Sequence, residues 1–297
     1  MRKALKGLLI IALSLVLLTG CSKTVNTQVS NGEQVIMDIK GNEITKAEIY
    51  KYLKLRFGPN LITTNLIDMQ LEQHVTLDAQ DEKEGQRLLE ETKELLKEDF
   101  EQIIVASGYK DVDDYYNRVI LSKLKNEKLF DTYLSENLKE ITDGLSSAKV
   151  KKIKTNSKPQ AEQALAELKE KESVTAEDFV SMANTYSNEE IKGETKVEHV
   201  YEERAELKFL NEKLVNAKPG LVDEVIMDGD AFYVIFFEEM DLEADKDVII
   251  ASIKENQSVN PIVSQSMFAH YSSLGNFTIH DTDLYDLFKE SNPFLVK

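Results

Sequence analysis

The feature of this sequence that most constrains its fold is a change in the spacing of its apolar residues near residue 145. From Thr45 to about Leu138 the apolar residues recur at helical spacing, as in the four-residue steps from Ile49 to Leu53 and Phe57. The polar cluster at residues 142–147 then ends this pattern. The change predicts a domain boundary at that cluster, with a helical region before it.

Beyond the boundary the elements are shorter and mixed. Strands are predicted at 149–155, 222–227 and 231–237, and helices at 159–171, 175–186 and 205–216. Asp228-Gly229-Asp230 separates two apolar runs, which is a strong hairpin signal. The order predicts a small antiparallel sheet covered by helices on one face. The chain as a whole is therefore predicted to be α+β and mostly helical.

The C-terminal tail returns to a helical pattern from residue 243 to about 274, followed by an extended piece at 277–280 and a short helix at 284–288. These 55 residues are too few to form a separate core, so they are predicted to pack on the first helical region. The predicted segments are a signal peptide, a tether, an N-terminal helical segment, the mixed domain and the tail, at 1–20, 21–34, 35–145, 146–242 and 243–297.

The first twenty residues have the organisation of a signal peptide. Arg2, Lys3 and Lys6 provide a positive start, and an almost unbroken apolar run follows from Leu8 to Leu18. This run is shorter than the roughly 20 residues that a membrane-spanning helix needs. The pattern predicts export of the chain and removal of residues 1–20.

The only cysteine, Cys21, follows Leu18-Thr19-Gly20 at the end of the apolar run. A single cysteine excludes an intramolecular disulfide. The four residues resemble the lipobox of bacterial lipoproteins, which implies that Cys21 becomes the N-terminal residue and carries a diacylglycerol. The alternative is a plain secretory signal followed by an incidental cysteine.

The charge balance limits the classes of partner. The formal net charge is −17, and it becomes −20 when the three cations of the signal peptide are removed. Nucleic acid and anionic headgroups are therefore excluded as partners for most of the surface. The four histidines share no spacing that would suggest a metal site, and no cofactor is predicted.

Three segments of the mixed domain carry a family resemblance. They are Phe179 to Ser187, Lys218 to Asp223 and Phe232 to Ile235. In place and order they resemble a parvulin-type peptidyl-prolyl isomerase domain. Together with the lipobox in front and the helical segments on both sides, the mature chain resembles a PrsA-type foldase lipoprotein.

The resemblance implies a lipid-anchored protein on the outer face of the cell membrane of a Gram-positive bacterium. Its partners would be unfolded or nascent secreted proteins. Whether the chain also forms a homodimer is left open by the sequence. Members of the family assist folding after export and in some cases rotate X-Pro bonds, whose barrier is roughly 18–20 kcal/mol. The implied chaperone surface lies in residues 35–140 and 243–297, without a pattern that identifies its lining.

The family's isomerase site has two histidines on neighbouring strands, an acid or thiol in a loop, and apolar residues around the proline ring. The matching positions here are Lys152 and Tyr233 for the histidines, Glu194 or Thr195 for the acid, and Leu210 and Val215 for the proline pocket. Both histidines are thus replaced. His199 lies in the loop nearby, where a solvated side chain is expected. The lysines Lys149, Lys151, Lys152 and Lys154 are expected to form a solvated strand face.

Two main hypotheses follow. In the first, the chain is an ATP-independent foldase or chaperone whose parvulin-like site is catalytically silent. In the second, it is an active peptidyl-prolyl cis-trans isomerase with an altered site. A solute-binding lipoprotein would show repeated strand–helix units around a hinge, and the long helical stretch argues against that class.

Overall fold

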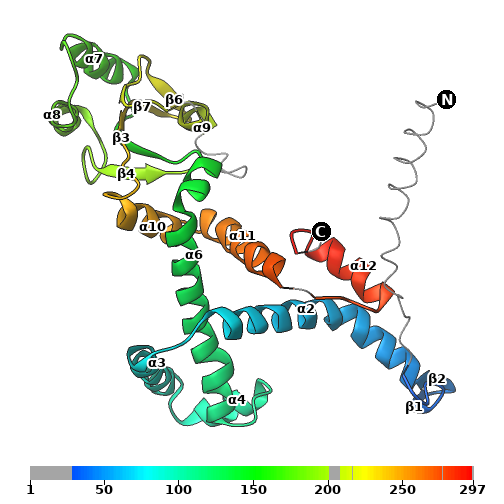
Figure 1. Cartoon of the computed structure of the whole chain (residues 1–297). Coiled ribbons are helices and arrows are strands. Elements are labelled where there is room, and N and C mark those ends of the chain that lie inside the picture. Colours follow the sequence, from blue (N-terminus) through cyan, green and yellow to red (C-terminus); the bar gives the residue numbers. More distant parts are fainter. Residues whose placement is uncertain (1–28, 201–207, 216, 276, 296–297) are drawn as a thin grey trace, which may run out of the picture. The chain divides into compact units, whose positions relative to one another are not determined.

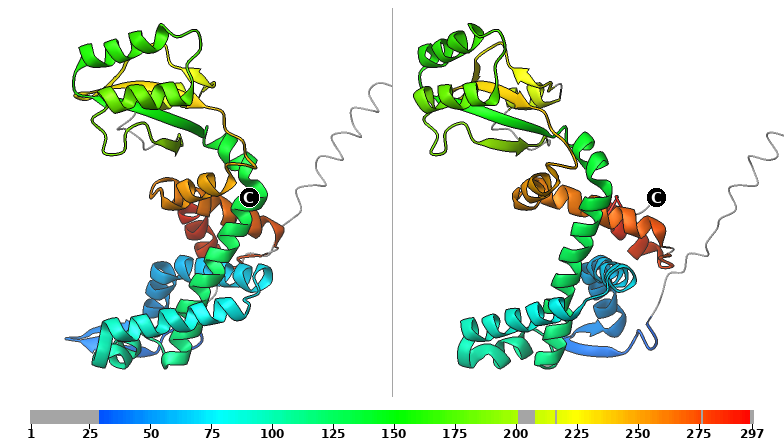
Figure 2. Two further views of the ribbon diagram at one scale, coloured as in Figure 1. Left: turned by 90° about the vertical axis from the view of Figure 1, so that its left-hand side faces the viewer. Right: turned by 60° about the vertical axis from the view of Figure 1, so that its left-hand side comes forward.

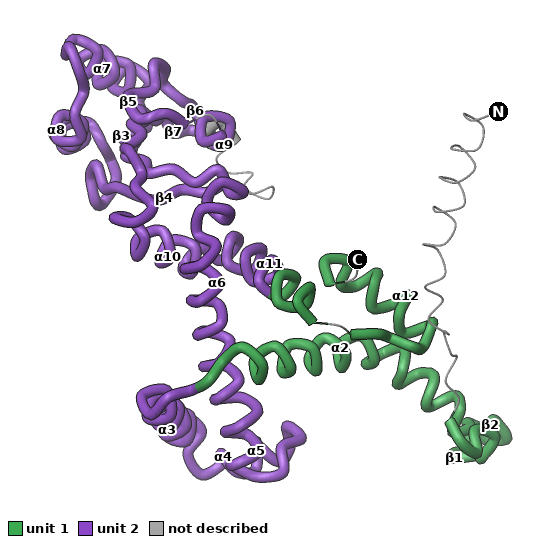
Figure 3. The backbone as a smooth tube through the Cα atoms, in the orientation of Figure 1, with its two compact units in different colours: residues 1–76, 268–297 green, residues 77–267 purple. Residues whose placement is uncertain are grey.

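The computed structural model describes residues 29–200, 208–215, 217–275 and 277–295, without the side chains of 208–210. The chain forms two compact units (Figure 3). Unit 1 contains residues 1–76 and 268–297, and unit 2 contains residues 77–267. The predicted α+β class, mostly helical with small sheets, is confirmed (Figure 1). The predicted domain boundaries stay a prediction.

Unit 1 begins with a two-stranded antiparallel hairpin, β1 (Val35–Ile39) and β2 (Asn42–Thr45). The turn uses Lys40 and Gly41, both at positive φ. Helix α2 (Lys46–His74) starts directly after β2, and the predicted capping box forms: Glu48 N donates to Thr45 Oγ1, and Thr45 N donates to Glu48 Oε2. The helix continues through Gly58 and Pro59 as one element.

The core of unit 1 lies between α2 and the C-terminal helix α12 (Thr282–Ser291). Leu66, Phe288 and Leu295 are buried there. The extended chain ahead of α12 adds Phe277 and Ile279 to the same cluster. The predicted short C-terminal helix is therefore present, and it is longer than the pattern indicated.

Unit 2 begins with a helical part. Its elements are α3 (Ala79–Leu96), the 3₁₀ turn η2 (Lys97–Asp99), α4 (Phe100–Ala106), α5 (Val112–Tyr115), the π-helical turn η3 (Tyr116–Leu121) and α6 (Ser122–Gly144). Two helices that follow the sheet in sequence, α10 (Lys246–Glu255) and α11 (Val259–Leu274), complete the set, with α11 passing into unit 1 at residue 268. Leu89, Phe100 and Ile104 form a core between α3 and α4.

The sheet of unit 2 begins where α6 ends. Its strands are β3 (Ala148–Thr155), β4 (Thr195–Glu198), β5 (Gly220–Leu221), β6 (Ile226–Asp228) and β7 (Ala231–Glu238). They pair antiparallel in the order β4-β3-β7-β5, and β6 also pairs with β7. Asp228 pairs with Ala231, with Gly229 in the turn at positive φ, so the predicted hairpin is present.

Helices pack on both faces of this sheet (Figure 2). Helices α7 (Lys158–Lys169) and α8 (Ala176–Tyr186) bury Ile153, Val234 and Phe236 on one face, which we call the α7–α8 face. On the opposite face Leu214, the last residue of α9 (Lys208–Leu214), packs with Val150, Ile235 and Phe237. The expectation of helices on one face alone was wrong, because β7 carries apolar side chains on both faces.

Candidate functional site

The strand register shows which predicted site residues share a face. Lys152 lies opposite Ile235, and Lys154 lies opposite Tyr233. Because side chains alternate along a strand, all four point to the side of the sheet on which Leu214 packs, which we call the α9 face. The structure therefore brings the two positions that match the family's histidines, Lys152 and Tyr233, to one face.

Lys152 is held by an acidic partner. Its Nζ lies 2.7 Å from Oε1 of Glu198, and only 14% and 13% of the two side chains are exposed. An amine fixed in this way is a cation bound to a carboxylate, next to the buried Ile235. It lacks the dual donor and acceptor capacity of an imidazole.

Tyr233 is half-buried and packs at the edge of the core on the α9 face. The ammonium of Lys154 lies 5.9 Å from the centroid of its ring, which is cation–π distance. Near Lys152 and Lys154 lies the carboxyl group of Glu189. Burial raises the pKa of this group, and the positive charges of Lys152, Lys196 and Lys154 act to lower it.

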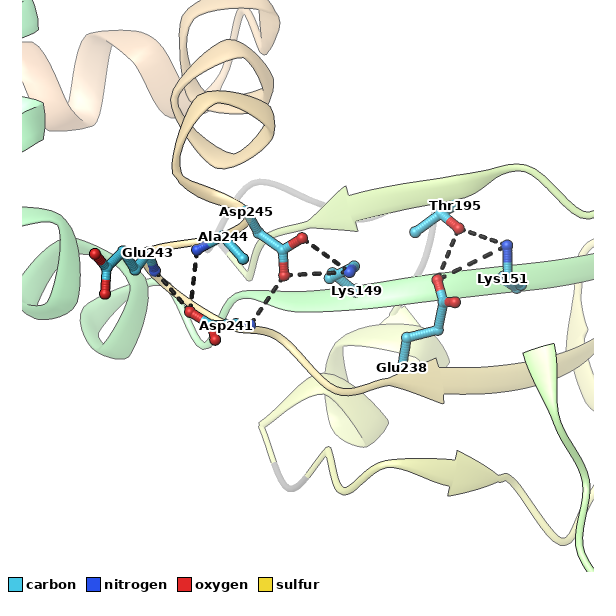
Figure 4. Close-up of polar contacts among 8 residues, drawn as sticks. All are labelled: Lys149, Lys151, Thr195, Glu238, Asp241, Glu243, Ala244 and Asp245. Carbon is cyan, nitrogen blue, oxygen red and sulfur yellow. Dashed lines mark hydrogen bonds and ion pairs between the residues drawn. The ribbon is translucent and has the colours of Figure 1, made fainter.

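Thr195 is separated from this arrangement, whereas Glu194 lies near Glu189 and Lys196, which belong to it. Thr195 pairs with Lys151, and both point to the α7–α8 face. There Lys151 Nζ lies 2.5 Å from Thr195 Oγ1, and Thr195 Oγ1 donates to Glu238 Oε2 at 2.7 Å (Figure 4). Glu194 pairs with Lys196 at 3.1 Å, and this hydrogen bond raises the pKa of Lys196. Thr195 thus lies on the face opposite to Lys152 and Tyr233.

Val215 directly follows α9 and is exposed. It lines an open pocket of about 410 Å³ together with Leu214, Ala217 and polar residues near the end of α6. Leu210 belongs to α9, but its side chain lies outside the described residues, as does the whole of Cys21. These roles stay predictions.

Two expectations about polar side chains in this region were wrong. His199 is only 1% exposed, with Nδ1 2.7 Å from Ser147 Oγ and Nε2 2.9 Å from Ser252 Oγ. Ser252 donates its hydroxyl proton to the carbonyl of Ile249, so it accepts from the histidine. His199 therefore connects the end of β4 with α10.

The lysines of β3 do not form a solvated face either. Lys149 pairs with Asp245 at 3.0 Å, and Lys151 is 8% exposed beside Thr195 and Glu238 (Figure 4). Lys149 and Lys151 point to one face and Lys152 to the other, and each of these three meets an acid from a different segment. Three of the four lysines thus form ion pairs that connect β3 to its neighbours, and the fourth, Lys154, lies over the ring of Tyr233.

Exposed apolar side chains gather in unit 1. Half of the large apolar side chains that are exposed in the described part of the chain lie between Val35 and Leu61. Four of them follow one another at four-residue steps along α2: Ile49, Leu53, Phe57 and Leu61, exposed by 37%, 47%, 53% and 63%. We call these four the apolar stripe. The spacing that predicted the helix was correct, but it did not indicate that this side is uncovered.

A charged cluster lies on the same part of α2. Lys54 Nζ is 3.1 Å from Asp281 and 2.8 Å from Asp283, and the side chains of Lys54 and Asp281 are buried. Burial acts to lower the pKa of Lys54, but the hydrogen bonds and charges of Asp283 and Asp281 outweigh it and raise the pKa. Asp281 also caps α12 by accepting from Leu284 N. The cluster fixes α12 against α2.

The described residues contain neither a membrane-spanning helix nor a metal site. Within the described ranges, no helix combines the length and the apolar character that crossing a membrane requires. No group of three or more His, Cys, Asp or Glu side chains in that part of the chain is arranged to hold a metal ion.

Comparisons with solved structures identify proteins that share this fold. No family model and no curated protein matches the chain. Among solved structures, a peptidylprolyl isomerase (PrsA) from Bacillus cereus is 18% identical, with a TM-score of 0.50, and the match covers 88% of this chain and 99% of that chain. PrsA from Bacillus subtilis is 19% identical at a TM-score of 0.38, with 87% and 99% covered. The predicted resemblance to PrsA-type foldases is confirmed at the level of the fold.

Proposed function

We propose that this chain, which shares the fold of the PrsA foldases, is an extracytoplasmic chaperone that assists the folding of secreted proteins. Its clients are unfolded or nascent chains on the outer face of the membrane. The likeness to PrsA of Bacillus cereus supports the fold. The observation that carries the function is the apolar stripe of α2.

The stripe is a surface that a folded protein leaves exposed only at a cost. Contiguous apolar patches on a soluble protein mark sites of interaction with a protein or a membrane. Unfolded clients expose apolar segments of many sequences, and a helix face of Ile, Leu and Phe covers such segments without requiring a fixed geometry. Burial of apolar area supplies roughly 25 cal/mol per Å², which makes this binding favourable and sequence-tolerant.

We propose that residues 146–242 form an inserted parvulin-like domain that is catalytically silent. Lys152, which the family resemblance assigns to the first histidine position, forms an ion pair with Glu198. Tyr233, at the second, supplies a phenol in place of an imidazole. Each tenfold gain in rate requires about 1.36 kcal/mol of transition-state stabilisation, and this charged arrangement offers little to a neutral, twisted prolyl bond.

The test compares two activities of the full mature chain. It should suppress aggregation of an unfolded client, and its turnover of a proline tetrapeptide should be at background. The double variant Leu53→Ser/Phe57→Ser should lose most of the suppression. Leu95→Ser, which changes an 80% exposed leucine outside the stripe, is the matched control and should keep it.

Two results would contradict the proposal. Equal suppression by the double variant would remove the stripe from client binding. Robust isomerase turnover that is lost on Lys152→Ala or Tyr233→Ala would establish the active-isomerase alternative. The alternative is that a second copy of the chain, and not a client, covers the stripe. Light scattering would then show a dimer for the wild type and a monomer for the double variant.

We further propose that Cys21 carries the lipid anchor that keeps the chain at the membrane. Because the chain has no other thiol, Cys21→Ser should abolish thioether lipidation and move the protein from the membrane fraction to the medium. Labelling with a radioactive fatty acid and fractionation of cells would measure both effects. Retention of the variant at wild-type levels would show that the anchor lies elsewhere.

A further inference from the structure

Unit 1 contains a pocket of about 440 Å³ between α2 and the chain segment that leads into α12. The size is within the range of ligand-binding pockets. Six apolar side chains provide most of its lining: Ile62, Leu66, Met69, Phe277, Ile279 and Leu284. A pocket with this lining favours an apolar group over a charged one.

The walls of the pocket are held in place by packing. Leu66 is buried in the core of unit 1, and Ile62, Met69, Phe277 and Ile279 pack around that core. Leu284 approaches α2 closely at Gly58, where an added Cβ would collide with the leucine side chain. Glycine at this position therefore allows α12 to lie close enough to α2 to form the wall.

The charge at the rim is negative. Asp281 lines the pocket but is buried against Lys54, and the carboxylate open to solvent beside this pair is that of Asp283, whose side chain is 42% exposed. His280 also lines the pocket, and the net charge of the chain is −17. A bound segment with a positive side chain beside its apolar group complements this rim.

We propose that the pocket anchors one large apolar side chain of an unfolded client, at a position flanked by a basic residue. The inference rests on the proposed function and names the class of client segment. The pocket adjoins the apolar stripe, because the lining residue Asn65 lies one helical turn after Leu61 and its side chain donates to the Leu61 carbonyl. Aggregation-prone segments of natural proteins are apolar and are commonly flanked by charged gatekeeper residues, which is the pattern the pocket and its rim fit.

The experiment uses the full mature chain and three fluorescent peptides in anisotropy titrations. The first is a Gly/Ser peptide with one Phe flanked by Lys, the second replaces the Phe by Ala, and the third replaces the Lys residues by Glu. Asn65→Trp places a large ring at the pocket, at an exposed lining position. Thr64→Trp is the matched control, since Thr64 is exposed on the same helix and does not line the pocket.

We expect Asn65→Trp to weaken binding of the Phe–Lys peptide by about tenfold, the equivalent of about 1.4 kcal/mol. Thr64→Trp should bind as the wild type does, and the Ala and Glu peptides should bind more weakly than the Phe–Lys peptide. Thr278→Trp, at an exposed position on the opposite wall, is a second blocking variant in case Asn65→Trp unfolds.

If both blocking variants bind the Phe–Lys peptide as tightly as the wild type does, the pocket does not anchor clients. If the stripe variants nevertheless lose the suppression of aggregation, the proposed chaperone function stands without the pocket. A chain that neither binds the peptides nor suppresses aggregation would overturn both proposals. A change from dimer to monomer on blocking the pocket would identify a second copy as its occupant and would also overturn the inference.

Discussion

Helix α2 of unit 1 leaves apolar side chains in water, whereas strand β3 of unit 2 covers charged ones. Along α2, four large apolar side chains are exposed at successive four-residue steps. Along β3, three lysines are largely covered and paired with acids from β4, β7 and the start of α10. The first arrangement leaves apolar area available to a partner. The second uses charge to connect segments within one unit.

The difference separates a surface that serves binding from one that serves the fold. Buried ion pairs are costly to break and add little net stability over apolar residues, so they fix geometry more than they stabilise it. Exposed apolar side chains add little to the fold, because the area that they would bury is still in water. Variants in the two regions should therefore differ sharply in their effect on the free energy of unfolding.

Among the charged residues, the largest effect on stability is expected for Glu198→Ala. The substitution leaves the Lys152 ammonium without its carboxylate partner at a position where only 14% of the side chain is exposed. The free energy of unfolding should fall by about 3 kcal/mol, measured by urea denaturation of the full chain followed by circular dichroism.

The control for this prediction is the double variant Lys152→Met/Glu198→Leu, which removes both charges and keeps apolar volume. Its free energy of unfolding should lie close to that of the wild type, because a paired charge and its partner can be replaced together. A Glu198→Ala variant as stable as the wild type would show that water reaches Lys152 and that β3 is not held by this pair.

Local signals in the sequence predicted much of the fold. Thr45 and Glu48 marked the start of α2, Thr175 the start of α8, and Asp228-Gly229-Asp230 the turn before β7. Each of these depends on residues within a few positions of one another, so each can be recognised without the rest of the chain. Lys152 and Tyr233 were assigned to the histidine positions by the family resemblance alone, and it is the strand pairing of the structure that puts them on one face.

Burial was not predictable in the same way. The carboxylates that cover the lysines of β3 come from Glu198, Glu238 and Asp245, 46 to 96 residues away in sequence. The four-residue spacing along α2 identified a helix with an apolar side, but no local pattern shows whether another element covers that side. The pocket of unit 1 was missed for the same reason, since its two walls are more than 200 residues apart.

A smaller effect is expected from the partly exposed ion pair between Lys171 and Asp178 at the start of α8. Hydrogen bonds from Lys171 and from Thr175 lower the pKa of Asp178 to about 2 from its usual value of 3.8. Because the folded-state pKa is the lower one, the carboxylate contributes stability above about pH 4, and this contribution is lost as the pH falls towards 2.

Asp178→Asn should remove that part of the pH dependence and leave the rest. Thermal unfolding of the wild type and the variant between pH 5 and about 2 would measure the difference, with Asp223→Asn as the control because Asp223 pairs with Lys169 but its side chain is 93% exposed. Identical pH profiles for the wild type and Asp178→Asn would show that this pair does not form in solution.

The smallest effect on stability is expected for Phe57→Ser, and it tests the comparison most directly. Phe57 is 53% exposed and is part of the apolar stripe, so its ring loses little protein contact on substitution. The free energy of unfolding should change by no more than about 0.5 kcal/mol. Leu66→Ala, nine residues further along the same helix and 7% exposed, should instead lower it by about 3 kcal/mol.

If both substitutions lower the free energy of unfolding by the same amount, the stripe is covered in solution by another part of the chain or by a second copy, and this side of α2 would be a core rather than a binding surface. If only Leu66→Ala destabilises, the apolar stripe is not required for folding, and its exposure is explained by what it binds.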